Sequence, residues 1–309
     1  MTTISAITAE RLTKRYGDKT AVDGLDLTVE RGRIACLLGP NGSGKSTTIG
    51  MLTTLRRSSA GWATVCGFDI AGDPARVRAV SGVTLQHTGV DEAMTGREVL
   101  ELQGTLQGLG RGATRARAGE LIDLLGLDSH ADTKLATWSG GLRRRIDLGT
   151  ALVHRPQVLF LDEPTTGLDP ASRRGLWAEI RRLNDEEGVT VLLTTQYLEE
   201  ADRLADVVTI LREGRLVVTA TPASLKSGLG ERRLRVVLPR KEVADAAEAR
   251  LGAGRSVERF ASDTISIAVD HPEDVARCIA DVADTQLEVT SLTVDEPSLE
   301  DVFFHLTAA

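Results

Sequence analysis

The stretch that decides the fold of this chain is rich in glycine, and it reads Gly39-Pro40-Asn41-Gly42-Ser43-Gly44-Lys45-Ser46-Thr47. An apolar run over residues 34–38 precedes it and is typical of a strand buried on both faces. A helical pattern follows it through Leu55. The stretch matches G-x-x-x-x-G-K-[ST], in which backbone N–H groups at a helix N-terminus surround a phosphate. We therefore predict a phosphate loop; the alternative, an incidental turn containing Lys-Ser, does not explain the flanking strand and helix.

Three side chains of this loop have separate expected tasks. Lys45 is placed to reach the β- and γ-phosphates, and Ser46 to hold Mg²⁺ through its hydroxyl. Thr47 lies within reach of the α-phosphate. ATP and Mg²⁺ are therefore the cofactors that the sequence predicts.

A second nucleotide motif follows the apolar run Val158-Leu159-Phe160-Leu161 and consists of Asp162 and Glu163. A buried parallel strand delivers side chains at its carboxyl edge, where open α/β sheets bind ligands. We expect Asp162 to bind Mg²⁺ and Glu163 to polarise the attacking water. An Asp-Glu pair alone would fit a helix cap or a solvated turn equally well, so this interpretation depends on the presence of the phosphate loop.

Composition excludes several classes of protein. The chain has 309 residues, 41% of them hydrophobic, and a net charge of −7, which argues against a disordered chain and against a basic nucleic-acid binder. Its three cysteines, Cys36, Cys66 and Cys278, are odd in number and far apart, so we expect small buried thiols in a reducing compartment. We find no run of about 18 apolar residues and no apolar signal core near the N-terminus, so we expect neither a membrane span nor secretion.

The pattern along the chain predicts two domains. Buried strands alternate with helices over residues 1–225, which indicates an α/β domain, whereas residues of about 88–152 read as a helical insert. Residues 226–309 read as β-α-β-β-α-β, the order of a ferredoxin-like unit. A final helix is expected from Ser298 to Leu306, with Ser298 and Asp301 close to a capping-box pattern.

Further motifs lie between and around the two nucleotide motifs. They are Gln86 after a strand, Trp138-Ser139-Gly140-Gly141-Leu142 at the start of a helix, and Gly167-Leu168-Asp169 after Glu163. Together, in this order, residues 4–225 resemble the nucleotide-binding subunit of an ABC transporter. The resemblance implies a cassette of the phosphate-loop NTPase fold, with a mixed core sheet, an antiparallel β subdomain and a helical subdomain.

The resemblance also implies an ATP-sandwich dimer of two copies in head-to-tail arrangement. Ser139, Gly140 and Gly141 would contact the ATP bound by the other copy, although Ser139 also fits an ordinary N-cap. Gln86 would contact Mg²⁺ and couple the site to a membrane partner, the alternative being polar surface. Tyr16 would stack on adenine, and Asp169 would meet the other copy.

Two departures from the family pattern bear on turnover. Leu142 stands where the signature usually has Gln, and Gln196 stands where most members have His. Gln can hydrogen-bond a phosphate or a water molecule but does not titrate near neutral pH. The expected catalytic set is therefore Glu163, Lys45 and Gln196.

The stretch Thr194-Thr195-Gln196-Tyr197-Leu198-Glu199-Glu200-Ala201-Asp202 and the residues 297–304 resemble the daunorubicin-resistance branch of the family. That resemblance implies an ATPase that powers efflux of a drug, antibiotic or similar hydrophobic compound through a separate ABC-2 type permease. The protein would then work at the cytoplasmic face of the cell membrane. Arg56–Ser59 and Thr88–Thr95 would lie near the permease. The run Arg143-Arg144-Arg145 would form a helix face in the dimer or toward the permease, not toward nucleic acid.

Two alternatives remain at this stage. One is a soluble ATPase of this family acting on ribosomes or DNA, which is disfavoured because the chain has a single phosphate loop and only about 90 residues between Ser46 and Ser139. The other is a nucleotide switch with weak hydrolysis and a non-transport partner, which Leu142 and Gln196 make worth testing.

Overall fold

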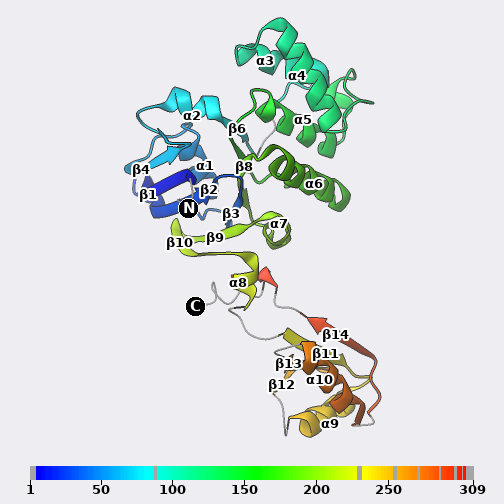
Figure 1. The fold of residues 1–309 in the computed structure, drawn as a ribbon. Helices are drawn as coiled ribbons and strands as arrows, with labels where there is room; N and C mark the ends of the chain where they lie inside the picture. The colour runs from blue at the N-terminus through cyan, green and yellow to red at the C-terminus, as the bar shows by residue number, and fades with distance from the viewer. Residues whose placement is uncertain are drawn as a thin grey trace. The chain divides into compact units, whose positions relative to one another are not determined.

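The computed structural model of the chain divides into two compact units, Met1–Pro222 and Ala223–Ala309 (Figure 1). It describes residues 5–86, 89–227, 232–252, 256–269, 272–284, 287–295, 298–300 and 302–303. Thr88 of the expected permease-facing stretch lies outside the described residues, as do Pro297, Asp301 and Phe304 of the C-terminal motif.

The centre of the first unit is a six-stranded sheet in the order β10-β9-β3-β8-β7-β6, and all neighbours are parallel except β9 and β10. Every residue of β3, β7 and β8 is buried, as expected for strands covered on both faces. The strands are β3 (Ile34–Leu38), β6 (Ser81–Thr84), β7 (Val158–Asp162), β8 (Thr190–Thr195), β9 (Val207–Arg212) and β10 (Arg215–Ala220).

A second, antiparallel sheet of the same unit has the order β2-β1-β4-β5. The alternating burial of β2 is typical of an antiparallel strand with one solvated face. Helix α1 (Lys45–Leu52) packs against strands of both sheets, so the helix that follows the phosphate loop lies in the core. The strands are β1 (Ser5–Tyr16), β2 (Lys19–Glu30), β4 (Ala60–Val65) and β5 (Phe68–Asp69), followed by helix α2 (Pro74–Val80).

Three helices and a short 3₁₀ turn make up the helical subdomain, and Figure 1 shows them gathered beside β6, the edge strand of the six-stranded sheet. They are α3 (Gly96–Leu106), α4 (Arg111–Leu124), η1 (Leu135–Thr137) and α5 (Gly140–Leu152). Trp138 is buried among them, and its Nε1 donates to Thr133 Oγ1 over 2.9 Å. Its ring lies so close to Gly96 that a Cβ there would be 2.5 Å from the indole, so Trp138 is a core residue.

Two more helices return the chain to the central sheet. Helix α6 (Pro170–Glu187) connects β7 to β8, and α7 (Leu198–Leu204) connects β8 to β9. This arrangement places the carboxyl ends of β3, β7 and β8 at one edge of the sheet, where the glycine-rich loop, Glu163 and Gln196 follow them. Near the boundary between the units lies α8 (Pro222–Ser227).

The second unit is an antiparallel sheet in the order β12-β13-β11-β14 with two helices, the ferredoxin-like arrangement expected from the sequence. Its core joins sheet residues such as Leu234 and Ile267 to Ala244 and Cys278 of the helices. Residues 299–300 and 302–303 are helical, as expected for the final helix. The elements are β11 (Arg232–Val237), α9 (Lys241–Leu251), β12 (Val257–Ala261), β13 (Thr264–Val269), α10 (Pro272–Asp284) and β14 (Ser291–Asp295).

Cys36 and Cys278 are buried, as expected, whereas Cys66 is only half-buried, contrary to expectation. Burial raises the pKa of Cys36 and of Cys66. Among the described residues, no helix has both the length and the apolar character needed to cross a membrane.

Candidate nucleotide-binding site

The phosphate loop connects β3 to α1, as the sequence predicts, and its conformation depends on glycine. Gly44 has a φ of 103°, and a Cβ at this residue would lie 2.5 Å from the carbonyl oxygen of Ala21. The left-handed conformation and the close approach of β2 both exclude larger residues. The N-terminus of α1 begins at the next residue, so its free N–H groups face the loop.

Lys45 is held inside the loop by hydrogen bonds to the main chain of the loop. Its side chain is only 4% exposed, and its Nζ donates to the carbonyl oxygens of Gly39 over 2.8 Å and of Pro40 over 3.2 Å. A phosphate group would offer a charged acceptor in place of these neutral carbonyls. Ser43 is also buried, and its Oγ has no hydrogen-bond partner among the described residues.

Asp162 lies at the end of β7, and two hydroxyl groups fix its carboxylate. Its Oδ1 accepts from Ser46 Oγ over 2.9 Å and from Thr194 Oγ1 over 2.6 Å. The side chain is 5% exposed. The structure thus brings together Ser46 and Asp162, two of the three residues that the sequence assigned to Mg²⁺. It also adds Thr194 of β8, which the sequence analysis placed in a motif but gave no task.

Glu163 follows Asp162 in an unusual backbone conformation, with a φ of 48°. Its N–H donates to Thr194 O over 3.1 Å and to Thr194 Oγ1 over 3.0 Å, which holds the turn in place. Its carboxylate accepts from Gln86 Nε2 over 3.2 Å and lies 3.5 Å from Lys45 Nζ. Strained backbone of this kind costs about 1–3 kcal/mol and is concentrated at functional sites.

A cavity of about 420 Å³ opens between these groups, and it is of the size that binds a small ligand. Its walls include nine residues that the sequence assigned to ATP binding or to catalysis, Gln86 and Glu163 among them. The complete lining is Tyr16, Lys19, Ala21, Asn41, Gly42, Gly44, Lys45, Ser46, Thr47, Gln86 and Glu163.

Tyr16 lies at the rim of this cavity and is 43% exposed. Lys14 Nζ lies 5.0 Å from its ring centroid, and Arg56 Nη1 donates to its hydroxyl over 2.6 Å. An exposed aromatic ring beside a phosphate loop is available for stacking on a base. Gln196 is half-buried and follows β8 at the same sheet edge, but it does not line the cavity.

The signature residues and Asp169 lie side by side at two helix N-termini. Ser139 caps α5 by accepting from Leu142 N over 3.3 Å, which confirms its alternative reading as an N-cap. Asp169 caps α6 through the N–H groups of Ala171 and Ser172, and hydrogen bonds from Ser172 lower its pKa. Gly141 lets these helix starts approach, since a Cβ there would lie 2.6 Å from Ser172 Oγ.

One expectation for the neighbouring arginines is wrong. Arg143 is partly exposed and pairs with Glu92 at 2.5 Å, as a surface residue would. Arg144, however, is buried with its side chain only 7% exposed. Arg144 shares a helix face with Leu148 and Leu152, so the helical periodicity predicts that it is buried. The run of three arginines gives no such indication.

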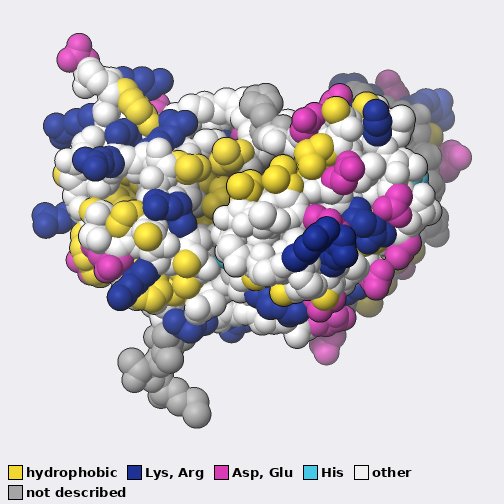
Figure 2. Space-filling model, turned by 90° about the horizontal axis from the view of Figure 1, so that it is seen from above, with side chains coloured by type: hydrophobic (Ala, Val, Ile, Leu, Met, Phe, Trp, Pro, Cys, Tyr) yellow, Lys and Arg dark blue, Asp and Glu magenta, His cyan; other side chains and the backbone are white. Residues whose placement is uncertain are grey.

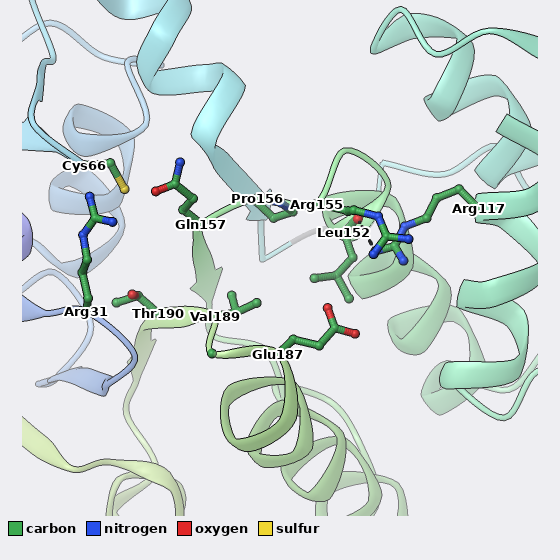
Figure 3. Close-up of a pocket in the computed structure, with 11 residues that line it drawn as sticks. Arg31, Cys66, Arg117, Leu152, Arg155, Pro156, Gln157, Glu187, Val189 and Thr190 are labelled. Carbon is green, nitrogen blue, oxygen red and sulfur yellow. Dashed lines mark hydrogen bonds between the residues drawn. The ribbon is translucent and has the colours of Figure 1, made fainter. Parts of the chain in front are cut away.

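Two other hollows lie away from the nucleotide cavity. A cavity of about 550 Å³ lies near the starts of β7 and β8, at the opposite end of the sheet, and Arg31, Arg117 and Arg155 are among its walls (Figure 3). A groove of about 400 Å³ runs along α3 and is lined by apolar residues such as Leu85, Leu102 and Leu106. Figure 2 shows hydrophobic side chains gathered in a band across the face that is uppermost in Figure 1.

The residues of the site fit a magnesium nucleotide. The loop offers unsatisfied backbone N–H groups, a buried lysine and an unpartnered hydroxyl, which are donors for phosphate oxygens. Asp162, Ser46 and Gln86 offer oxygen ligands of the kind Mg²⁺ prefers, with phosphate oxygens and water able to complete its octahedron.

Comparison with known proteins identifies the class to which this fold and site belong. Residues 22–166 match the family model for ABC transporters, and residues 221–307 match that for the C-terminal domain of DrrA1-3-like ATP-binding proteins. The chain belongs to the ATP-binding subunits of ABC transporters, in the daunorubicin-resistance branch, and is an ATPase. The resemblance inferred from the motifs is therefore confirmed.

The similarity to curated relatives extends over the whole chain. It is 46% identical to the daunorubicin/doxorubicin resistance ATP-binding protein DrrA of Streptomyces peucetius, over 98% of this chain and 92% of that one. It is 36% identical to the linearmycin resistance ATP-binding protein LnrL of Bacillus subtilis, over 97% of both chains.

Solved structures show the same fold for the cassette. An ATP-binding subunit of an ABC transporter superposes with a TM-score of 0.64 at 26% identity, over 72% of this chain and 92% of that one. The cassette MJ0796, in a dimeric post-hydrolysis state bound to ADP and Pi, gives a TM-score of 0.63 at 23% identity, over 70% and 98%.

Proposed function

We propose that this ATPase powers the export of a drug, antibiotic or similar hydrophobic compound through a separate permease of the ABC-2 type, at the cytoplasmic face of the membrane. The observation that carries the proposal is the match to resistance ATP-binding proteins along the whole chain, including the second unit. Those relatives are named for resistance to daunorubicin, doxorubicin and linearmycin.

In this proposal, two copies close over two molecules of MgATP. Lys45 and the loop bind the phosphates, and Asp162, Ser46 and Gln86 hold Mg²⁺, which supplies charge neutralisation at the transferring phosphoryl group. Glu163 accepts a hydrogen bond from the attacking water and polarises it. Ser139, Gly140 and Gly141 of the second copy offer a helix N-terminus to the γ-phosphate.

Three further residues complete the proposed site. Tyr16 stacks on adenine, Asp169 meets the second copy, and Gln196 orients the γ-phosphate or the water once the dimer has closed. The groove along α3 supports the proposed permease contact, because Leu85 lines it and Gln86 is the next residue. A conformational change of a partner bound in this groove could therefore act on the Gln86–Glu163 hydrogen bond through the adjacent residue Leu85.

Transport by inverted membrane vesicles tests the proposal. The full chain is co-expressed with the permease that copurifies with it, and uptake of daunorubicin, followed by its fluorescence, is measured with and without MgATP. We expect ATP-dependent uptake that is lost with the Glu163→Gln variant. ATP hydrolysis that proceeds at an unchanged rate with and without the permease, with no uptake of any antibiotic tried, would instead favour a soluble switch with a non-transport partner.

A further inference from the structure

The guanidinium group of Arg144 lies buried beside the end of β7, and its three nitrogens donate to five acceptors. Four of the acceptors are main-chain carbonyl oxygens, which belong to two separate segments of the chain. The acceptors are Pro164 O (from Nε, 2.7 Å), Leu85 O (from Nη1, 2.7 Å), Asp147 Oδ2 (from Nη1, 2.9 Å), Asp162 O (from Nη2, 3.3 Å) and Glu163 O (from Nη2, 3.5 Å).

The first of these segments is the turn that carries Glu163. Arg144 binds the carbonyls of residues 162, 163 and 164, and therefore holds the main chain before and after Glu163. Glu163 itself has a φ of 48°, a conformation that persists in a non-glycine residue only when its surroundings enforce it. On the other side, Thr194 accepts the Glu163 N–H. The turn is thus fixed by a β8 threonine and an α5 arginine.

The second segment leads to Gln86. Arg144 binds the carbonyl of Leu85, and Gln86 donates to the Glu163 carboxylate over 3.2 Å. One guanidinium group therefore fixes the main chain beside both partners of the Gln86–Glu163 hydrogen bond. Asp147, one turn along α5, accepts from Arg144 Nη1 and orients the guanidinium plane.

We propose that Arg144, oriented by Asp147, is a positioning residue for ATP hydrolysis, which sets the direction of the Glu163 carboxylate and its hydrogen bond to Gln86. This inference rests on the proposed role of Glu163. It assigns to the signature helix α5 a task within its own subunit, in addition to the phosphate contact across the dimer.

Only arginine has the geometry that these contacts require. Its planar fork presents five donors in fixed directions, whereas lysine has three donors on one nitrogen and cannot reach acceptors on three sides. Methionine fills much of the same volume but leaves four carbonyls without a donor. Both substitutions should therefore release the catalytic turn while leaving the phosphate loop untouched, because Arg144 makes no contact with it.

The test measures ATP turnover and ATP affinity of the full chain for Arg144→Lys and Arg144→Met. We expect kcat to fall by about tenfold to hundredfold while the dissociation constant for ATP changes by less than about threefold. The matched control is Arg117→Met, since Arg117 is equally buried and donates to Leu152 O over 2.9 Å far from the site. This control should lower the melting temperature but keep kcat of the folded protein within about twofold.

A double-mutant cycle separates positioning from a general loss of structure. In the Glu163→Gln background, Arg144→Met should lower the residual turnover by less than about twofold, because its effect passes through Glu163. Independent, multiplying losses would overturn the inference, and so would wild-type kcat in either Arg144 variant or an equal loss of ATP affinity. Wild-type turnover in Glu163→Gln alone would contradict the proposed role of Glu163 instead.

A second pair of variants applies even if Arg144 cannot be replaced without unfolding. Asp147→Asn keeps an acceptor oxygen for Arg144, and we expect kcat within about threefold of wild type. Asp147→Leu removes the acceptor, and we expect the tenfold loss of kcat with ATP affinity retained. Equal turnover in both Asp147 variants would contradict the orienting role of the carboxylate.

Discussion

At the scale of single residues, the site depends on hydrogen bonds between protein groups that fix its charged side chains. Asp162 is held by two hydroxyl groups and Glu163 by Gln86 and Thr194. Such preorganisation removes the cost of arranging these groups during the reaction. Thr194 contacts both carboxylate residues, and its loss should therefore be visible in the metal requirement.

Replacement of Thr194 by valine keeps the shape of the side chain and removes its hydroxyl. Hydrogen bonds to charged groups contribute about 1.5–3 kcal/mol, so we expect the Mg²⁺ concentration for half-maximal ATPase activity to rise about tenfold or more. Thr194→Ser is the control and should behave like wild type. An unchanged Mg²⁺ requirement in Thr194→Val would show that the 2.6 Å contact to Asp162 is not needed.

Asp147 should make stability depend on pH in a defined direction. Burial raises its pKa from 3.8 to about 6, although the adjacent Arg144 opposes part of the rise. Between these two pH values the folded protein binds more protons than the unfolded chain, so this residue's contribution to stability falls as pH rises, by up to about 1.4 kcal/mol per pH unit.

Denaturant unfolding of wild type and Asp147→Asn between pH 4 and pH 7 measures this effect. Asparagine cannot ionise, so the free energy of unfolding of the variant, relative to wild type, should increase over this interval. A difference that stays constant, or that decreases, would contradict the raised pKa of Asp147.

Site residues that belong to motifs of fixed spacing were predictable from the sequence, whereas residues whose role depends on packing were not. Lys45, Ser46, Asp162 and Glu163 belong to local motifs, and the structure brings them together in one cavity wall or its immediate surroundings. The burial of Arg144 was not predicted, because its neighbours are also arginines and only the helical periodicity distinguishes the buried one. Whether Gln196 takes part in the reaction stays a prediction, since it does not line the cavity of a single copy.

At the scale of elements, helix N-termini recur as the means of building the site. The starts of α1, α5 and α6 carry the phosphate loop, the Ser-Gly-Gly sequence and Asp169, respectively. Ser139 and Asp169 already have structural tasks as N-caps. Removal of the Ser139 side chain would therefore change both the stability of α5 and the proposed contact with nucleotide. A substitution that keeps the N-cap is needed to separate the two effects.

Ser139→Asp makes this separation. Aspartate is an equally good N-cap, so we expect the melting temperature to change little. Its negative charge would face the γ-phosphate in the proposed dimer, so we expect ATP-induced dimerisation of the full chain, measured by light scattering, to be abolished. Thr95→Asp is the matched control, because Thr95 also caps its helix, α3, through its side chain and has no proposed contact with the nucleotide of the second copy. Dimerisation unaffected by Ser139→Asp would argue against the contact across the dimer.

Element boundaries followed the sequence pattern closely where periodicity was strong. The apolar periodicity of the sequence predicts helices over residues 95–106, 170–183 and 198–204. The first and the third are α3 and α7, but the second, α6, extends to Glu187, four residues beyond the predicted end. The same pattern predicts the last strand of the second unit over residues 287–294, but this strand, β14, begins only at Ser291. Apolar periodicity cannot locate these ends. The polar last turn of a helix has no apolar residues to mark it as helical, and apolar residues just before a strand continue the strand's pattern.

At the scale of the whole molecule, the second unit distinguishes this chain from a bare cassette. Its sheet order and its match to the DrrA1-3-like C-terminal domain support the branch that the sequence motifs indicated. The pattern β-α-β-β-α-β was readable because each strand is short and apolar on one face. Its task was not predictable, since no cluster of chemically active side chains marks it in the sequence.

The central claim is that Glu163 activates the attacking water at a site that binds ATP through other residues. Phosphate release by Glu163→Gln in a single turnover, measured beside its dissociation constant for ATP, tests this claim most directly. We predict a fall in hydrolysis of about hundredfold or more, with ATP affinity within about threefold of wild type. Hydrolysis at the wild-type rate would contradict the claim.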